Sequence, residues 1–454
     1  MVEPSLSADD VKALIRSRQY VGFLLLSAVV GLVASLVAWS FLTLTPWIQE
    51  AVFDDLPGQL GFDAPPRWWP IPILALAGLI TALAITRLPG RGGSIPADGF
   101  GSGPPTRYVD LPGVILAGLA TLGLGLVLGP SSPVIAIGAG LGLLVVHLVR
   151  KNAPNHALMV MSAAGSCAAF AMVFRSPMVS AIVILEALGL SGTLVPVVLL
   201  PSLIGAGIGS IVYLGLGDLT GLSVDAYALY PLELADMGDL TAAQIVWTIP
   251  LAVVVAAAVF VVVTVGRRIA RIVAPRQLVW LPVVGIGVAV LAILFTRTGE
   301  TSYTVLFSGS KALAPIVERG PALPLATLAW LVVLKGAAWS LSMGAFRGGA
   351  VFPAIFLGTV GGLMAERLPG LPAGAAVAIV MAAAVVSALR LPLSSVVITN
   401  RSGVGRRCAG RDPRRDLGGR RVHRDRPDLR PSGRRRTRCR SRVTNARRFV
   451  RLWP

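Results

Sequence analysis

The chain has 454 residues, of which 54% are hydrophobic and only 14% charged, and its mean hydropathy is +0.75. Because a soluble domain of ordinary composition carries about 25% charged residues, these values exclude a soluble globular protein. They indicate an integral membrane protein that crosses the bilayer many times. The formal net charge of +19 is spread unevenly, since residues 401–454 alone contain 20 Arg and 4 Asp and carry +16.

Residues 1–19 open the chain with a charged pattern typical of a short amphipathic segment on the membrane surface, not of a cleaved signal. Apolar runs of about 20 residues can span a bilayer, and such runs lie at 20–45, 69–88, 110–129, 193–216, 244–266, 277–296 and 324–343. Shorter or less regular runs lie at 133–150, 157–174, 177–190, 350–364 and 373–389. The arginines of "GRRIARIV" (266–273) indicate a cytoplasmic flank. We therefore expect a multi-pass protein of the cell membrane.

Two Gly/Pro-rich stretches begin apolar runs in the same way, "GPSSPVIAIGAGLG" from residue 129 and "GGAVFPAIFLGTVGG" from residue 348. Their Pro and Gly residues match at an offset of 220, and Arg175-x-Pro177 matches Arg390-x-Pro392 at an offset of 215. Equal order at a nearly constant offset indicates an internal duplication, with halves at about 20–216 and 244–400. Many transporters are built from such repeats, with ion sites where broken helices meet.

A helix that begins inside the membrane leaves its first N–H groups without acceptors. These groups and the positive end of the helix dipole favour an anion, glycine lets the backbone approach it, and a serine hydroxyl adds a donor. Irregular backbone of this kind is tolerated only where protein or water surrounds it. Two such helix starts, one from each half, therefore predict one shared anion site.

The residue types needed for other chemistry do not form recognisable patterns. The three cysteines, Cys167, Cys408 and Cys439, lack the spacing of a metal site or a disulfide framework. We find no set of nucleophile, base and orienting group, and no nucleotide loop, and so expect neither an enzyme nor a metal or cofactor. Among charged residues within the runs, Glu186 could be functional or interfacial, and Lys311 and Lys335 could reach toward the interface or line a vestibule.

The arginine-rich tail starts abruptly after Asn400, within an apolar helix. It could be an out-of-frame translation, since GC-rich coding DNA in another frame yields Arg, Gly and Pro but almost no Lys. It could also be a native disordered tail, or a basic arm for anionic lipid or nucleic acid. The first explanation accounts for most of its features, and we expect no nucleic-acid partner.

With "GSGPP" (101–105) as a third stretch, the chain resembles the CLC family of chloride channels and chloride/proton antiporters, whose filter motifs are GSGIP, GxEGP and GxFxP. The resemblance covers about residues 20–400. It implies an all-α membrane fold, an inverted repeat of broken and tilted helices, in a homodimer with one pore per subunit. It also implies chloride or a similar anion as the substrate.

The resemblance implies particular site residues. The first motif places the central serine ligand at Ser102, next to Gly103, and the third places two backbone N–H ligands at Ala350 and Val351. The second motif places the backbone of Gly129, Pro130, Ser131 and Ser132 at the outer site. The family's gating glutamate falls on Ser131, which can neither carry nor release a proton near neutral pH. Its internal proton-transfer glutamate falls one residue past Glu186, and its pore-lining tyrosine has no counterpart after Tyr303.

These departures predict passive movement of small monovalent anions, most of all chloride, without coupling to protons. Two alternatives remain open at this point. The chain could be a degenerate or truncated membrane protein that transports nothing, or a proton-coupled exchanger that uses Glu186.

Overall fold

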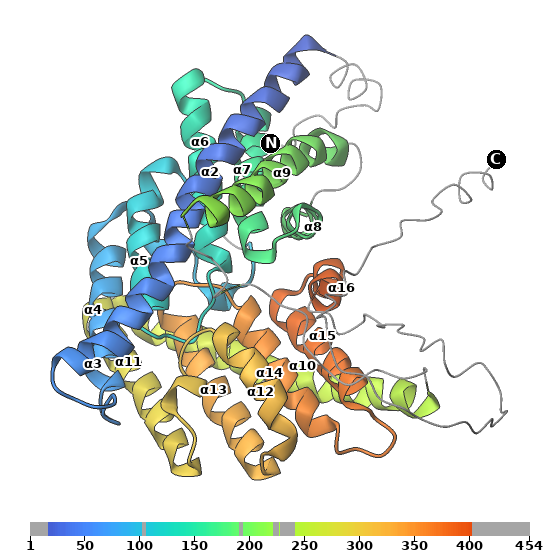
Figure 1. Ribbon diagram of the computed structural model, residues 1–454. Helices are drawn as coiled ribbons and strands as arrows, with labels where there is room; N and C mark the ends of the chain where they lie inside the picture. The colour runs from blue at the N-terminus through green and yellow to red at the C-terminus, as the bar shows by residue number, and fades with distance from the viewer. Residues whose placement is uncertain (1–16, 102–105, 190–193, 221–226, 228–240, 402–454) are drawn as a thin grey trace, which may run out of the picture. The chain divides into compact units, whose positions relative to one another are not determined.

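The computed structural model describes residues 17–101, 106–189, 194–220, 227 and 241–401, and the regular elements within these ranges are helices (Figure 1). The first half contains α2 (Arg18–Glu50), a π-helical turn (Ala51–Asp55), α3 (Leu56–Gln59), α4 (Pro70–Arg87), α5 (Leu111–Gly123), α6 (Ser131–Val149), α7 (Asn155–Phe174), α8 (Pro177–Ala187) and α9 (Leu194–Thr220). The second half contains α10 (Ala242–Val273), α11 (Gln277–Phe295), α12 (Ser310–Arg319), α13 (Leu325–Ala345), α14 (Val351–Ala365), α15 (Ala373–Leu389) and α16 (Pro392–Arg401). Short 3-10 turns lie at Pro89–Gly92, Pro96–Asp98, Tyr108–Asp110, Ala274–Arg276, Thr296–Thr298, Ser302–Thr304 and Gly320–Ala322.

Most helices carry an apolar surface suited to lipid. Within the described residues, seven helical segments are long and apolar enough to cross a membrane, and four shorter apolar helices accompany them. Large apolar side chains lie exposed on their outer faces, such as Leu25 on α2, Ile249 on α10 and Val333 on α13. Because hydrocarbon accepts such a surface without cost, the prediction of an all-α polytopic membrane protein is confirmed.

One predicted run is wrong over its second part. The run at 110–129 is helical only as far as Gly123, where α5 ends, and residues 124–130 are buried but not helical. Gly125 lies at a φ of 99° and accepts a hydrogen bond from the N–H of Phe307 (3.0 Å). Apolar composition cannot distinguish such a protein-enclosed loop from a helix.

The duplicated pattern corresponds to two equivalent sets of three helices. α6, α7 and α8 form the first set and α14, α15 and α16 the second, with α14 beginning 220 residues after α6. Arg175 ends α7 and Arg390 ends α15, both with left-handed backbone (φ of 51° and 59°). A proline then begins the third helix of each set, Pro177 in α8 and Pro392 in α16. The two arginines therefore end helices at equivalent positions of the two halves.

Glycines allow the first two helices of each set to approach closely. A Cβ on Gly138 of α6 would lie 2.3 Å from the carbonyl oxygen of Gly165 in α7. In the second set, a Cβ on Gly358 of α14 would lie 2.6 Å from the Cα of Met381 in α15. Because no side chain fits at either contact, the matched glycines keep the same packing in both halves.

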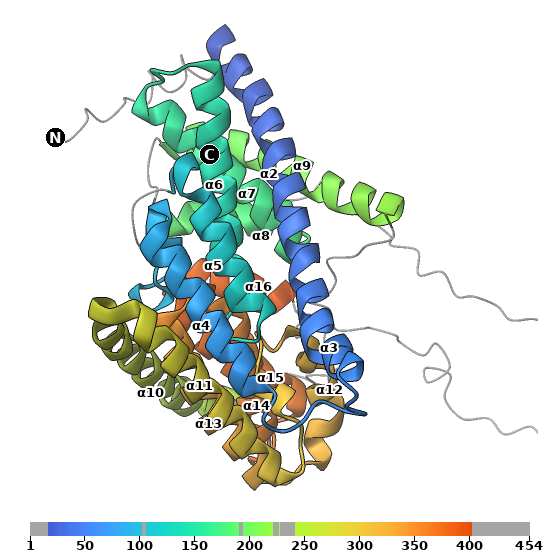
Figure 2. The ribbon, with the colours of Figure 1, turned by 90° about the vertical axis from the view of Figure 1, so that its left-hand side faces the viewer.

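The two sets point in opposite directions. Tyr20 at the start of α2 shares a buried cluster with Val145 near the end of α6. Near the end of α14, Leu363 contacts the turn that follows α12, and α12 is joined to the end of α2 by the Lys311–Glu50 ion pair (3.2 Å). Figure 2 shows α6 toward the start of α2 and α14 toward its end. The predicted inverted repeat is confirmed.

Charge differs between the two ends of the fold. Basic residues lie in the last turns of α4 and α10 or just after α4, α6 and α10, namely Arg87, Arg91, Arg150, Lys151, Arg267, Arg268, Arg271 and Arg276. Acidic residues dominate the end where α2 finishes, namely Glu50, Asp54, Asp55 and Asp63. By the positive-inside rule we expect the end with the basic residues to face the cytoplasm. We call the opposite end, where α2 finishes, the outer end.

Candidate functional site

The starts of α6 and α14 meet directly. Gly129 and Gly349 exchange two backbone hydrogen bonds of 2.8 and 2.6 Å, which form an isolated antiparallel bridge. Both residues stand two positions before the first residue of their helix. The structure thus brings together the two Gly/Pro-rich stretches, as the duplicated pattern predicts.

Backbone donors gather at this junction. Within the described part of the chain, no residue accepts a hydrogen bond from the N–H groups of Ser131, Ser132, Ala350 or Val351. Ala350 and Val351 are 8% and 0% exposed, so bulk water cannot easily serve as their acceptor. Two helix dipoles that start at one buried point, each with free donors, favour a small anion there.

Ser131 lies at the centre of the junction. Its side chain is 0% exposed, and its Oγ has no hydrogen-bond partner within the described residues. The hydroxyl fills the space beside Gly349, where an added Cβ would lie only 1.7 Å from Oγ. Pro130, not Ser131, is the N-cap of α6, and no side chain caps this helix. The capping role that a serine at a helix start would ordinarily have is therefore absent.

Aromatic rings enclose the junction on one side. The ring of Phe352, in the first turn of α14, packs against Gly129, where a Cβ would meet it at 2.8 Å. The same ring lies 6.2 Å from Phe174 and 6.2 Å from Tyr227, between centroids. Tyr227 is buried, and its hydroxyl accepts a hydrogen bond from Gln49 Nε2 (3.3 Å). The sequence offered no signal for Tyr227, because it lies far along the chain from every recognised motif.

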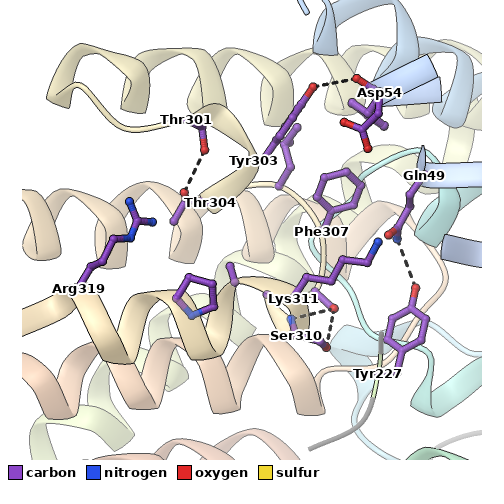
Figure 3. Close-up of a pocket in the computed structure, with 16 residues that line it drawn as sticks. Gln49, Asp54, Tyr227, Thr301, Tyr303, Thr304, Phe307, Ser310, Lys311 and Arg319 are labelled. Carbon is purple, nitrogen blue, oxygen red and sulfur yellow. Dashed lines mark hydrogen bonds between the residues drawn. The ribbon is translucent and has the colours of Figure 1, made fainter. Parts of the chain in front are cut away.

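A cavity of about 290 Å³ opens at the outer end next to these rings (Figure 3). Its lining includes Gln49, Phe53, Asp54, Tyr227, Thr301, Tyr303, Phe307, Ser310, Lys311 and Arg319. Lys311 extends from α12 across the cavity toward Gln49 (Figure 3) and pairs with Glu50. Of the two roles suggested for Lys311, the structure supports lining a vestibule.

Lys335 takes neither of the roles suggested by the sequence. It is 0% exposed in the middle of α13, and its Nζ donates to the carbonyl oxygens of Thr304, Val305 and Leu306 at 2.9, 2.9 and 3.0 Å. The carbonyl of Phe307 lies at 3.3 Å, and the ring of Phe356 lies 4.6 Å from Nζ. Lys335 therefore holds the loop that forms one wall of the cavity.

The first motif falls mostly outside the described residues, which include neither Ser102 nor Gly103. Gly101 is described. Its backbone has a φ of 71°, and a Cβ there would lie 3.4 Å from the Cβ of Ala187 at the end of α8. The first motif therefore begins beside the end of α8, which also carries Glu186.

Glu186 binds the start of a helix in the other half. Its Oε1 accepts the N–H of Leu393 (3.0 Å), and its Oε2 accepts the N–H of Ser394 (2.7 Å) and the Ser394 hydroxyl. In the first half, Ser176 caps the start of α8 itself. α16 has Leu391 at the equivalent position and takes its cap from Glu186. The sequence could suggest an acid near a helix end but not a target 207 residues away.

Glu186→Ala is expected to lower the free energy of unfolding by about 1–2 kcal/mol, because two N–H groups of α16 lose their acceptor. Glu186→Gln keeps one carbonyl oxygen and should lose less. Thermal unfolding in detergent measures both. Glu318→Ala, at an exposed position of α12, is the matched control and should change little. If Glu186→Ala unfolds at the wild-type temperature, this cap does not hold α16.

The matches to known proteins cover the same part of the chain. A family model described as "Voltage gated chloride channel" matches residues 100–401, which is more than half of the sequence. The chain belongs to the voltage-gated chloride channel family. As a member, it is a multi-pass protein of the cell membrane, of an anion-transporting family and not a family of enzymes. The matched range ends where the arginine-rich tail begins; residues 402–454 and 1–16 lie outside the described residues.

Individual relatives agree with the family assignment. "Putative ion-transport protein YfeO" of Escherichia coli O6:H1 is 28% identical over 395 residues, covering 85% of this chain and 90% of the relative. Two solved structures share the fold. A CLC-type fluoride/proton antiporter matches with a TM-score of 0.62 at 19% identity, over 84% of this chain and 94% of that one. A slow cyanobacterial Cl-/H+ antiporter matches with a TM-score of 0.59 at 15% identity, over 84% and 93%.

Proposed function

We propose that this member of the voltage-gated chloride channel family conducts small monovalent anions passively, chloride foremost, through one pore in each subunit of a homodimer. The observation that carries the proposal is the junction of α6 and α14. Unpaired N–H groups of Ser131, Ser132, Ala350 and Val351 converge there from two helix starts. Dipoles of this kind bind an anion without the strength of a direct ion pair, so that it can also leave.

The absence of a carboxylate at the gate position supports uncoupled movement. A gating glutamate can compete with an anion for the outer site and can take up a proton in exchange. Ser131 carries no negative charge, and its hydroxyl does not ionise near neutral pH. Its Oγ is also buried beside Gly349. The anion therefore has no side-chain competitor at this position.

A flux measurement on proteoliposomes tests the proposal. With an imposed chloride gradient and a pH electrode in the outer solution, we expect chloride efflux down its electrochemical gradient and no stoichiometric proton uptake. Efflux no faster than from empty liposomes would contradict anion conduction and favour a protein that transports nothing. Light scattering of the detergent-solubilised protein measures the dimer separately.

Ser131→Glu is expected to make the chloride flux depend on pH, fast at acid pH and slow at alkaline pH. The added carboxylate, once ionised, competes with the anion for the N–H groups of the two helix starts. Ser131→Gln is the control, because it adds similar bulk without a titratable group. A flux equally independent of pH in both variants would mean that residue 131 is not at the gate.

Proton-coupled exchange through Glu186 is the second candidate, because both solved relatives described above are named as proton antiporters. Its carboxylate lies on the start of α16, beside the beginning of the first motif. If chloride drives protons uphill in wild type and Glu186→Gln abolishes that movement while chloride still flows, this candidate replaces the uncoupled one.

A further inference from the structure

The end of α13 brings an unfavourable charge close to the junction. This helix ends at Ala345, only four residues before Gly349, and its C-terminal carbonyl groups carry a partial negative charge of about half an electron. Next to a site made of backbone N–H groups, that charge would weaken the binding of an anion. A positively charged group near the C-terminal end of α13 would offset this partial negative charge.

Arg347 occupies the place where that offset is needed. Its side chain is buried, with 5% exposed. Nη1 donates to the carbonyl oxygens of Ala345 (3.4 Å) and Phe346 (3.3 Å), at the end of α13 itself. Nε donates to the carbonyl oxygen of Arg91 (3.3 Å), and the backbone N–H donates to Thr121 Oγ1 (3.4 Å). The guanidinium is thus held from two sides, two residues before the bridge.

No carboxylate neutralises this charge at contact distance. Among the described residues, none forms an ion pair with Arg347, and Nη2 makes no hydrogen bond. Asp98 is a nearby carboxylate, but it lies beyond ion-pair distance of the guanidinium. A buried cation whose hydrogen bonds all go to carbonyl groups is expensive unless a counter-charge lies close to it. A bound anion at the adjacent junction would be such a counter-charge.

In the first half, an uncharged side chain binds the carbonyl groups at the equivalent helix end. α5 ends at Gly123 before the bridge residue Gly129, and the carbonyl oxygen of Leu122 accepts a hydrogen bond from Gln49 Nε2 (2.9 Å). A neutral amide satisfies that carbonyl but adds no positive charge. The extra charge therefore belongs to one half only, and it follows from the sequence "FRGGAVFP" rather than from the duplicated pattern.

We propose that Arg347 is a positioning residue for the transported anion. The positive charge of its guanidinium offsets the partial negative charge at the C-terminal end of α13 and so strengthens anion binding at the junction of α6 and α14. This inference rests on the proposed anion conduction. It assigns Arg347 no contact with the anion. The guanidinium acts through the field at the site, so its charge matters more than its shape.

Halide titration calorimetry on the solubilised protein, together with liposome flux, tests the inference. Arg347→Gln should weaken chloride binding on the order of tenfold, with a parallel loss of flux at low chloride. Arg347→Lys keeps the charge but loses the forked geometry, and should recover most of the affinity. Arg276→Gln removes an exposed arginine from the turn after α10 and should bind chloride like wild type.

A purely structural role would give a different pattern. Misfolding would lower the number of binding sites per protein while the remaining sites kept the wild-type dissociation constant, and Arg347→Lys would not rescue them. That pattern, or unchanged affinity in Arg347→Gln, would overturn the inference. If wild type itself neither binds nor moves chloride, the proposed function fails instead.

Discussion

Lys335→Met is expected to lower the free energy of unfolding by roughly 3–5 kcal/mol, the largest stability loss that we predict for a single substitution. The side chain of Lys335 donates to the backbone carbonyls of Thr304, Val305 and Leu306, and the carbonyl of Phe307 lies close by at 3.3 Å. Methionine fits the volume but offers no donor, and each buried acceptor left without one costs about 1–3 kcal/mol. Thermal unfolding in detergent, followed by size-exclusion chromatography, measures the loss.

Lys311→Met is the matched control for this substitution. Lys311 makes one ion pair, with Glu50, and both side chains are more than half exposed. Exposed pairs contribute about 0–1 kcal/mol, so this variant should unfold close to the wild-type temperature. If Lys335→Met is equally stable, the carbonyls of the loop have another partner and Lys335 does not hold the cavity wall.

Gly349→Ala is expected to abolish anion flux. The added methyl would lie 1.7 Å from Ser131 Oγ and 2.9 Å from its Cβ, so that the two helix starts must separate. Separation breaks the Gly129–Gly349 bridge and spreads the N–H groups that converge on the anion. Overpacking of this kind also costs about 1–3 kcal/mol of stability. Flux and thermal unfolding should be measured on the same preparation.

Two further variants make the result specific. Gly207→Ala, in α9, adds a methyl with no atom within 4 Å and should leave flux unchanged. Ser131→Gly combined with Gly349→Ala removes the clashing hydroxyl, which leaves the backbone nitrogen of residue 131 as the nearest atom, 3.1 Å from the added methyl. This double variant should recover part of the flux. Wild-type flux in Gly349→Ala alone would show that the bridge is not needed for conduction.

The sequence predicts the structure best where one physical rule acts over a long segment. Apolar run length located α4 and α11 to within one or two residues, because lipid imposes the same demand on every turn of a spanning helix. The repeat was also visible, because Gly and Pro are required at equivalent backbone positions in both halves. The same rule failed at residues 124–130, where protein and not lipid surrounds an apolar loop.

Isolated charged residues could not be interpreted without the fold. The sequence shows Lys335 in an apolar run, but its acceptors come from a loop about 30 residues earlier. It shows Glu186 near a helix end, but the N–H groups that it binds belong to the other half. Arg347 lies inside a recognised motif, yet its relation to the end of α13 depends on how the backbone turns between two helices. Partners brought together by tertiary structure leave no local pattern.

The Gly129–Gly349 bridge has a consequence for biosynthesis. Its two strands are 220 residues apart and contribute only backbone atoms. While the ribosome is still translating α13, α6 is already in the bilayer with a start that has no partner. The protein must therefore hold an unfinished helix start within the membrane for nearly half of its synthesis. Closing so long a loop is an entropic cost that only the completed second half can offset.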